Sequence, residues 1–225
     1  MSGAEGDRAP QTGPLLVACA LRIEQAALRS AGRGSARGPD PARAGAYTLL
    51  RTGMGPRAAE RAVLRALEGA GTERAAVLAT GFCAGLVPGM SPGDLVVAEE
   101  TRDPRGTVAC TGTALLAEAL ARAAPGRTVH IGPLTGSDHV VRGQERAQLR
   151  ATGAVAVDME SAATLRAAVR GAGRPVAAVR VIVDAPEHEL VRIGTVRGGI
   201  SAFRVLRAVL PAFYEWHRSS LLPRR

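Results

Sequence analysis

The sequence contains no lysine, so all 29 of its basic residues are arginines, and they are scattered along the chain. Together with the acidic residues they give a formal net charge of +9, which would suit a nucleic-acid partner if the arginines formed one patch. Aromatic residues make up only 3% of the chain, too few to build platforms on which bases stack. These two features argue against nucleic acid as a partner.

Cysteine is scarce, and no apolar run approaches the roughly 18 residues of a membrane-spanning helix. Cys19, Cys83 and Cys110 lack metal-binding spacing, as do the four histidines, so we expect free thiols, no metal and no cofactor. The first 14 residues combine glycine, proline and charge without the apolar segment of a signal peptide. We therefore predict a disordered tail at 1–14, a single domain at 15–220 and a cytoplasmic location.

Short apolar runs alternate with segments of helical periodicity. We predict strands at 15–21, 46–52, 74–80, 94–100, 127–136, 154–157 and 175–184, and helices at 22–31, 55–69, 113–124, 143–152, 158–170 and 198–217, with loops at 32–45 and after residue 80. The strands are continuous Val, Leu and Ala runs, which indicates burial on both faces. The pattern predicts an α/β protein, a three-layer α/β/α sandwich with a mixed, largely parallel central sheet.

Acidic and glycine-rich segments follow the predicted strands where the strands end. Glu24 follows the first strand, "DMES" at 158–161 follows another, and Asp184 ends the last. Glycine turns, "TGMG" and "TGFCAGL", follow two more strands, and their backbone N–H groups can face a ligand. A helix cap or a turn explains each acid alone, but not acids at the ends of so many strands. Because ligands of such folds bind at this edge, three carboxylates (Glu24, Glu160, Asp184) predict one site there.

Several segments carry a resemblance to a known family: "ALRIE", "LLRTGMG", "TGFCAGLVPGMSPGDLVV", "GSDHVV", "VAVDMESAA" and "VRVIVD". In this order and spacing they resemble the purine nucleoside phosphorylase/nucleosidase superfamily, and most of all its 5′-methylthioadenosine/S-adenosylhomocysteine nucleosidases. The resemblance implies cleavage of the N-glycosidic bond to adenine. It also implies a small-molecule nucleoside as the partner and a homodimer as the assembly.

The resemblance also implies a role for each matching residue. Asp184 would protonate the leaving purine, which requires a raised pKa. Glu160 would accept hydrogen bonds from the ribose hydroxyls and stabilise the positive charge that develops on the sugar. Glu24 would orient and activate water, Arg180 would lie near the nucleophile, and Met159 would pack against the sugar.

The remaining predicted substrate contacts are Val140, Val141, Phe82, Gly81 and Gly53. Three positions depart from the family pattern. Phe82 replaces a small residue after "TG", Val140 replaces an aromatic residue that stacks on the purine, and Val183 replaces a serine before the acid. The departures make the pocket less polar, so an apolar adenosine derivative should suit it.

The segments "LRIEQAALRSAG" and "FRVLRAVLPAFYEWHRSS" are similar to the hopanoid-biosynthesis-associated nucleosidase/phosphorylase branch, which implies adenosylhopane as the substrate. The second segment carries apolar residues at helical spacing: Phe203, Leu206, Leu210, Phe213 and Trp216. Packing in the core or in a dimer is one explanation for this stripe. Peripheral contact with a membrane surface is the other.

The choice of nucleophile stays open between water and phosphate. A phosphorylase needs donors for phosphate as its co-substrate, and Arg51, Arg57 and the "TGMG" turn could supply them. A hydrolase needs a base for water, and Glu24 would repel phosphate, so the residues favour hydrolysis. A third alternative, a catalytically inactive nucleoside-binding relative, follows from the departures at Phe82, Val140 and Val183.

Overall fold

The computed structural model describes residues 13–33, 47–69, 71–72, 74–170, 173–186 and 195–220. Most of the predicted tail at 1–14 and most of the loop predicted at 32–45 lie outside these residues, as does most of the segment before the last helix; residues 32 and 33 belong to a helix instead. Within the described part of the chain, no helix combines the length and the apolar character needed to cross a membrane.

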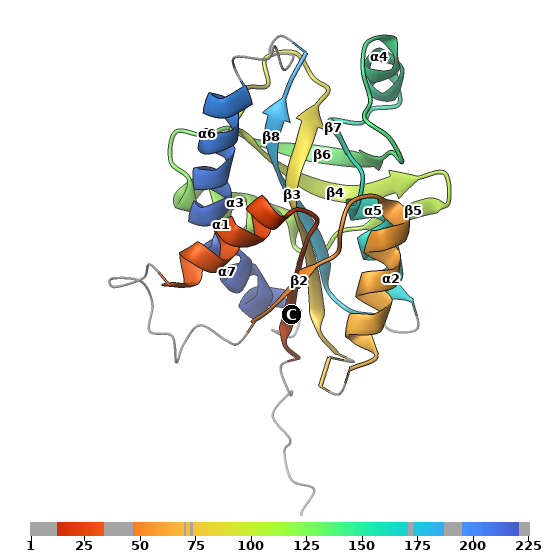
Figure 1. Ribbon diagram of the computed structural model, residues 1–225, viewed down its shortest axis with the longest axis vertical. Coiled ribbons are helices and arrows are strands. Elements are labelled where there is room, and N and C mark those ends of the chain that lie inside the picture. Colours follow the sequence, from red (N-terminus) through yellow and green to blue (C-terminus); the bar gives the residue numbers. More distant parts are fainter. Residues whose placement is uncertain are drawn as a thin grey trace, which may run out of the picture.

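One eight-stranded mixed sheet forms the centre of the molecule, as predicted (Figure 1). Its strands are β1 (Leu15–Cys19), β2 (Tyr47–Arg51), β3 (Ala76–Gly85), β4 (Leu95–Asp103), β5 (Gly106–Ala109), β6 (Val129–Gly136), β7 (Ala156–Asp158) and β8 (Val176–Asp184). Five strand pairs are parallel, and three (β3–β7, β4–β5 and β4–β8) are antiparallel. The sheet is therefore largely parallel.

Part of the sheet closes on itself. Strand β3 pairs with β8, β8 with β4, β4 with β6, β6 with β7, and β7 again with β3. The two antiparallel contacts, β3–β7 and β4–β8, complete this ring of five strands. The ring brings the ends of β3, β7 and β8 together, although β7 is separated from β3 by about 70 residues of sequence.

The helices are α1 (Arg22–Arg33), α2 (Pro56–Leu67), α3 (Thr113–Ala123), α4 (Gln144–Ala151), α5 (Ser161–Val169), α6 (Thr195–Ala208) and α7 (Leu210–Ser220). Figure 1 shows α1, α3, α6 and α7 on one side of the sheet and α2 and α5 on the other. Alternate residues of β1 pack on opposite faces of the sheet: Leu15 and Val17 belong to one apolar cluster, and Leu16 belongs to the other. This double burial explains the continuous apolar strands.

Four sequence expectations need correction. Strand β3 runs on to Gly85, where the glycines predicted a loop, and hairpin strand β5 (Gly106–Ala109) was missed. Helix α5 begins at Ser161 rather than at residue 158. The single helix expected at 198–217 is two helices, and Pro211 lies in the first turn of the second, where its missing N–H costs no helical hydrogen bond.

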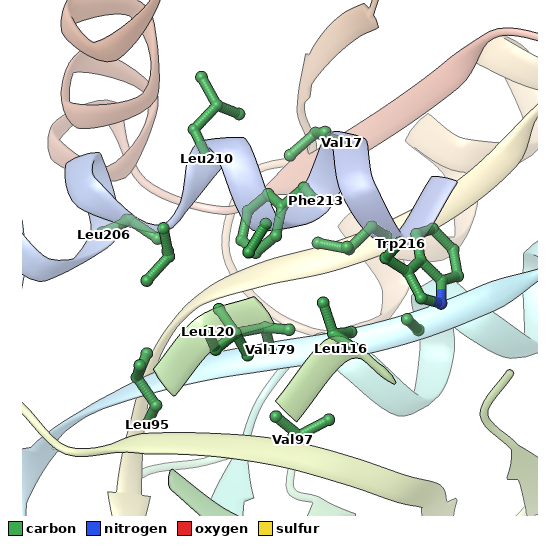
Figure 2. Close-up of a cluster of buried hydrophobic side chains, with 14 of the residues drawn as sticks. Val17, Leu95, Val97, Leu116, Leu120, Val179, Leu206, Leu210, Phe213 and Trp216 are labelled. Carbon is green, nitrogen blue, oxygen red and sulfur yellow. The ribbon is translucent and has the colours of Figure 1, made fainter. Parts of the chain in front are cut away.

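The apolar stripe of the C-terminal segment packs in the core. Leu206, Leu210, Phe213 and Trp216 are buried against residues of the strands and of α3, as Figure 2 shows. The indole N–H of Trp216 donates to the carbonyl oxygen of Thr111 at 2.7 Å. The membrane-surface explanation of this stripe is therefore wrong, and core packing is confirmed.

Candidate active site

A cavity of about 280 Å³ lies where β1, β3, β7 and β8 end. Seven of the predicted site residues line it: Glu24, Phe82, Val140, Val141, Met159, Glu160 and Asp184. The other three, Arg180, Gly81 and Gly53, are not in its lining. The topology thus brings the three predicted carboxylates to one cavity, as the strand ends indicated.

Glu24 is held by backbone donors from two segments. One carboxylate oxygen, Oε2, accepts the N–H groups of Ala20 (2.9 Å) and Leu21 (2.8 Å), in the turn that starts α1. The other, Oε1, accepts the N–H of Phe82 in β3 at 2.8 Å. Burial raises the pKa of Glu24, and these hydrogen bonds with the charge of Arg180 offset part of that rise. The side chain is fixed before any substrate arrives.

Gly81 makes this arrangement possible, although it does not line the cavity. Its φ of +137° lies in a region that side chains rarely adopt. A Cβ atom there would lie 2.4 Å from Glu24 Oε1 and 2.7 Å from Arg180 Nη1. Gly81 is therefore required for the close approach of an acid and an arginine to the β3 backbone.

Arg180 lies behind the carboxylates and is fully buried. Its Nε donates to Ser161 Oγ (2.9 Å) and lies 2.6 Å from Asp158 Oδ2, and its Nη1 donates to the carbonyl oxygen of Thr80 (3.1 Å). Burial alone would lower the pKa of Arg180, but the neighbouring carboxylates raise it overall. This cation compensates the buried negative charge of the site.

The two acids of the "DMES" segment both line the cavity but make different contacts. Asp158 Oδ1 accepts the N–H groups of Glu160 (3.3 Å) and Ser161 (3.1 Å), which fixes the turn before α5. Glu160 Oε1 accepts the N–H of Gly55 at 2.9 Å, and Oε2 lies 4.0 Å from Arg180 Nη1. Burial raises the pKa of Glu160, and the charge of Arg180 opposes that rise. The glycine turn therefore holds the carboxylate.

Arg146 is the site residue that sequence reasoning missed. It is the only residue of α4 that is buried, and one of its terminal nitrogens, Nη2, donates to Asp184 Oδ2 in an ion pair. Its Nε donates to the carbonyl oxygen of Val141 at 3.3 Å. The segment "GQERAQLRA" is polar almost throughout, so nothing in its pattern distinguishes Arg146 from the exposed Arg150.

The rest of the cavity wall is apolar. Met159, Phe82 and Val183 line it, and Met54 and Val140 stand at its rim with 66% and 62% of their surfaces exposed. Cys83 and His139 also line the cavity. Cys83 contributes to the cavity wall and to the core, with its pKa raised by burial. His139 bonds to acidic neighbours, Asp138 at 2.8 Å and Glu145 at 3.0 Å.

The cations predicted to hold phosphate do not reach this cavity. Arg51 and Arg57 are exposed and absent from its lining. The N–H of Gly55, in the "TGMG" turn, is engaged by Glu160. No group of histidine, cysteine and acidic side chains suited to a metal ion occurs within the described ranges.

A family model, described as the phosphorylase superfamily, matches residues 41–211, well over half of the chain. No protein of curated function matches the sequence significantly.

Solved structures resemble the fold over nearly the whole chain. A 5′-methylthioadenosine/S-adenosylhomocysteine nucleosidase from Neisseria meningitidis, in complex with methylthio-immucillin-A, is 21% identical with a TM-score of 0.69, over 89% of this chain and 98% of that one. The corresponding nucleosidase from Helicobacter pylori is 16% identical with a TM-score of 0.71, over 91% of this chain and 98% of that one. The futalosine hydrolase of Helicobacter pylori is 16% identical with a TM-score of 0.71, over 92% of this chain and 99% of that one. At these identities the likeness establishes the fold alone.

Proposed function

Because this chain belongs to the phosphorylase superfamily, we propose that it is an N-ribosyl hydrolase that releases adenine from a 5′-substituted, apolar adenosine derivative. The observation that carries this proposal is the convergence of Glu24, Glu160 and Asp184 on one cavity with apolar walls. Cleavage of an N-glycosidic bond builds positive charge on the ribose and negative charge on the departing purine. A buried, preorganised set of carboxylates is suited to the first of these charges.

The proposed roles follow the positions of the residues. Glu24 takes a proton from water while the water oxygen bonds to the ribose C1′ atom. The C1′–N9 bond breaks, its electron pair passes to the purine, and Glu160 stabilises the cationic sugar and accepts its hydroxyl hydrogen bonds. Asp184 lies on the purine side, where the family resemblance implies that it assists the leaving group. Over the whole reaction, water supplies the hydroxyl of the sugar and the proton of adenine.

Hydrolysis is favoured over phosphorolysis by the charges around the cavity. Two arginines lie next to its carboxylates, and each is already paired: Arg180 with Asp158 and Arg146 with Asp184. Gly55, whose N–H is a candidate phosphate donor, instead binds Glu160. Among the described residues, an incoming phosphate would therefore meet carboxylates with no free cation of the cavity lining to offset them.

The proposal of an apolar 5′ substituent is based on the residues at the rim of the cavity. Met54 and Val140 are largely exposed there, and Val183 and Phe82 continue the apolar wall inward. The similarity to the hopanoid-associated branch adds adenosylhopane to methylthioadenosine and S-adenosylhomocysteine as candidate substrates. We expect kcat/KM to rise with the length of an apolar 5′ chain, by up to roughly tenfold for every two buried CH₂ groups.

The test is adenine release from adenosylhopane, methylthioadenosine and S-adenosylhomocysteine, each measured with and without phosphate. We expect release without phosphate, and Glu160→Gln should lower kcat about 100-fold or more. This change keeps an oxygen for the N–H of Gly55 while it removes the charge. Glu118→Gln, on the exposed surface of α3, is the matched control and should behave as wild type.

Two results would replace the proposal with another function. Release that requires phosphate would make the protein a phosphorylase. Binding of these nucleosides without release in either buffer would make it a catalytically inactive relative.

A further inference from the structure

His139 stands at the rim of the cavity between two acids. It belongs to the loop 137–143, which joins β6 to α4, and 58% of its side chain is exposed. Its Nδ1 lies 2.8 Å from Asp138 Oδ1 in the same loop, and its Nε2 lies 3.0 Å from Glu145 Oε2 in the first turn of α4. An ionised carboxylate only accepts hydrogen bonds, and a neutral imidazole has a single donor. Both contacts are therefore hydrogen bonds at the same time only when the ring is a cation.

The contact with Glu145 ties the loop to α4 beside two residues of the cavity wall. Val140 and Val141 follow His139 directly, and both line the cavity. Arg146 of α4 already holds the carbonyl oxygen of Val141 at 3.3 Å. Val140, by contrast, is 62% exposed and gains little from packing. The ring of His139 thus adds a second tie between the loop and α4, next to the less well packed of the two valines.

We propose that His139 is a positioning residue: as a cation it fixes the loop 137–143 against α4, holds Val140 on the cavity wall and so strengthens nucleoside binding. This role rests on the proposed function for the identity of the ligand. A wall that is fixed before the ligand arrives does not have to be ordered on binding, which lowers the entropic cost of association. Loss of the proton leaves one ring nitrogen as an acceptor that faces a carboxylate, and that tie is lost.

The charges around the ring determine the pH range of this effect. Asp138 and Glu145 raise the pKa of His139 above its ordinary 6.5, and from α2 the charge of Arg57 acts on Asp138. The other charged side chains that line the cavity are Glu24, Arg146, Asp158, Glu160 and Asp184. Because the pKa of His139 is raised, the cation and both of its contacts are present below that pKa and are lost above it. Nucleoside binding should therefore weaken as the pH rises through it.

The experiment measures binding of the carbocyclic analogue of methylthioadenosine by isothermal titration calorimetry at pH 6 and pH 9. This probe has a CH₂ group in place of the ring oxygen, so it is not cleaved through an oxocarbenium ion. His139→Gln should bind it roughly two- to fivefold more weakly than the wild type at pH 6, the range expected for one exposed ion pair, and equally at pH 9. Titration of the cavity acids is common to both proteins and cancels in this comparison. His130→Gln, a histidine that contacts Asp94 outside the cavity lining, is the matched control and should follow the wild type at both pH values.

Two further variants separate charge from structure. His139→Arg keeps a cation at both pH values, so it should match the wild type at pH 6 and bind more tightly than the wild type at pH 9. Glu145→Gln removes the partner's charge without a change in the loop and should behave as His139→Gln does. If His139→Gln equals the wild type at pH 6, or is weaker by the same factor at both pH values, the charge of His139 does not strengthen binding and the proposal is wrong. A His139→Arg variant that is no tighter than the wild type at pH 9 also overturns it.

Failure of this proposal is distinguishable from failure of the proposed function. Binding of the analogue does not require turnover, whereas adenine release does. Adenine release with a wild-type pH dependence in His139→Gln overturns the role of His139 alone. Absence of release, with pH-dependent binding that His139→Gln abolishes, overturns the hydrolase and leaves the role of His139 standing. A wild type that does not bind the analogue at either pH overturns the role of His139, and adenine release then decides the function separately.

Discussion

Gly81→Ala is the substitution for which the geometry predicts the largest effect from one added methyl group. The new Cβ would lie 2.4 Å from Glu24 Oε1, whereas real Cβ atoms essentially never approach other atoms within 3.0 Å. The Glu24 carboxylate must therefore retreat by at least 0.6 Å, away from the N–H of Phe82, which now bonds to it at 2.8 Å. Arg180 Nη1, at 2.7 Å, must move as well.

These displacements add to the strain of placing alanine at a φ of +137°. The backbone strain costs about 1–2 kcal/mol, and a lost hydrogen bond to a carboxylate about 1.5–3 kcal/mol. We therefore expect the free energy of unfolding to fall by roughly 3–5 kcal/mol, which corresponds to a Tm lower by about 10 °C. A misplaced Glu24 should lower kcat about 100-fold.

Gly106→Ala is a matched control, because Gly106 has the same φ of +137° but nothing within 4 Å of an added Cβ. Its free energy of unfolding should fall only by the cost of the backbone strain, about 1–2 kcal/mol, and its kcat should stay at the wild-type value. Urea unfolding and adenine release measure both quantities. Equal stability losses in the two variants, with wild-type kcat in Gly81→Ala, would refute the contact between Gly81 and Glu24.

Three further predictions concern charge, pH and the core. Arg180→Met leaves Asp158 buried without its cation and should cost about 3–5 kcal/mol in urea unfolding; a loss below about 1 kcal/mol would show that Arg180 does not compensate it. Burial raises the pKa of Glu24 above its ordinary 4.5, so kcat should rise with pH through that higher value as the base ionises; a flat profile down to pH 4.5 contradicts this. Phe213→Ala should cost about 3–5 kcal/mol while the folded fraction keeps wild-type kcat, and a fall in kcat at equal folded fraction would refute a purely structural role.

The position of the site could be predicted from the sequence because it depends on a general property of α/β sheets. Parallel strands place their carboxyl ends at one edge, so Glu24 and Asp184, at or just after strand ends, had to lie near each other. Glu160 joined them because it follows the short strand β7. Burial on both faces was likewise encoded in the continuous apolar runs.

Other features depend on tertiary contacts that have no local signature. The glycines after Thr80 predicted a loop, but β3 continues through Gly81 because this segment pairs with β8. Glu24 and Arg180 leave no room for a side chain at Gly81. The closure of the strand ring depends on the pairing of β3 with β7 and of β4 with β8, between distant segments. Arg146 reaches the cavity only because of where the fold places α4.

The origin of the new oxygen on the sugar distinguishes hydrolysis from phosphorolysis most directly. Turnover of methylthioadenosine in H₂¹⁸O with phosphate present, followed by mass spectrometry of the sugar, distinguishes the two nucleophiles. Hydrolysis predicts a free sugar that carries one ¹⁸O atom from water at C1′, measured immediately after turnover and corrected for exchange of free sugar incubated alone. A sugar 1-phosphate, with no ¹⁸O at the C1′ oxygen, would contradict it.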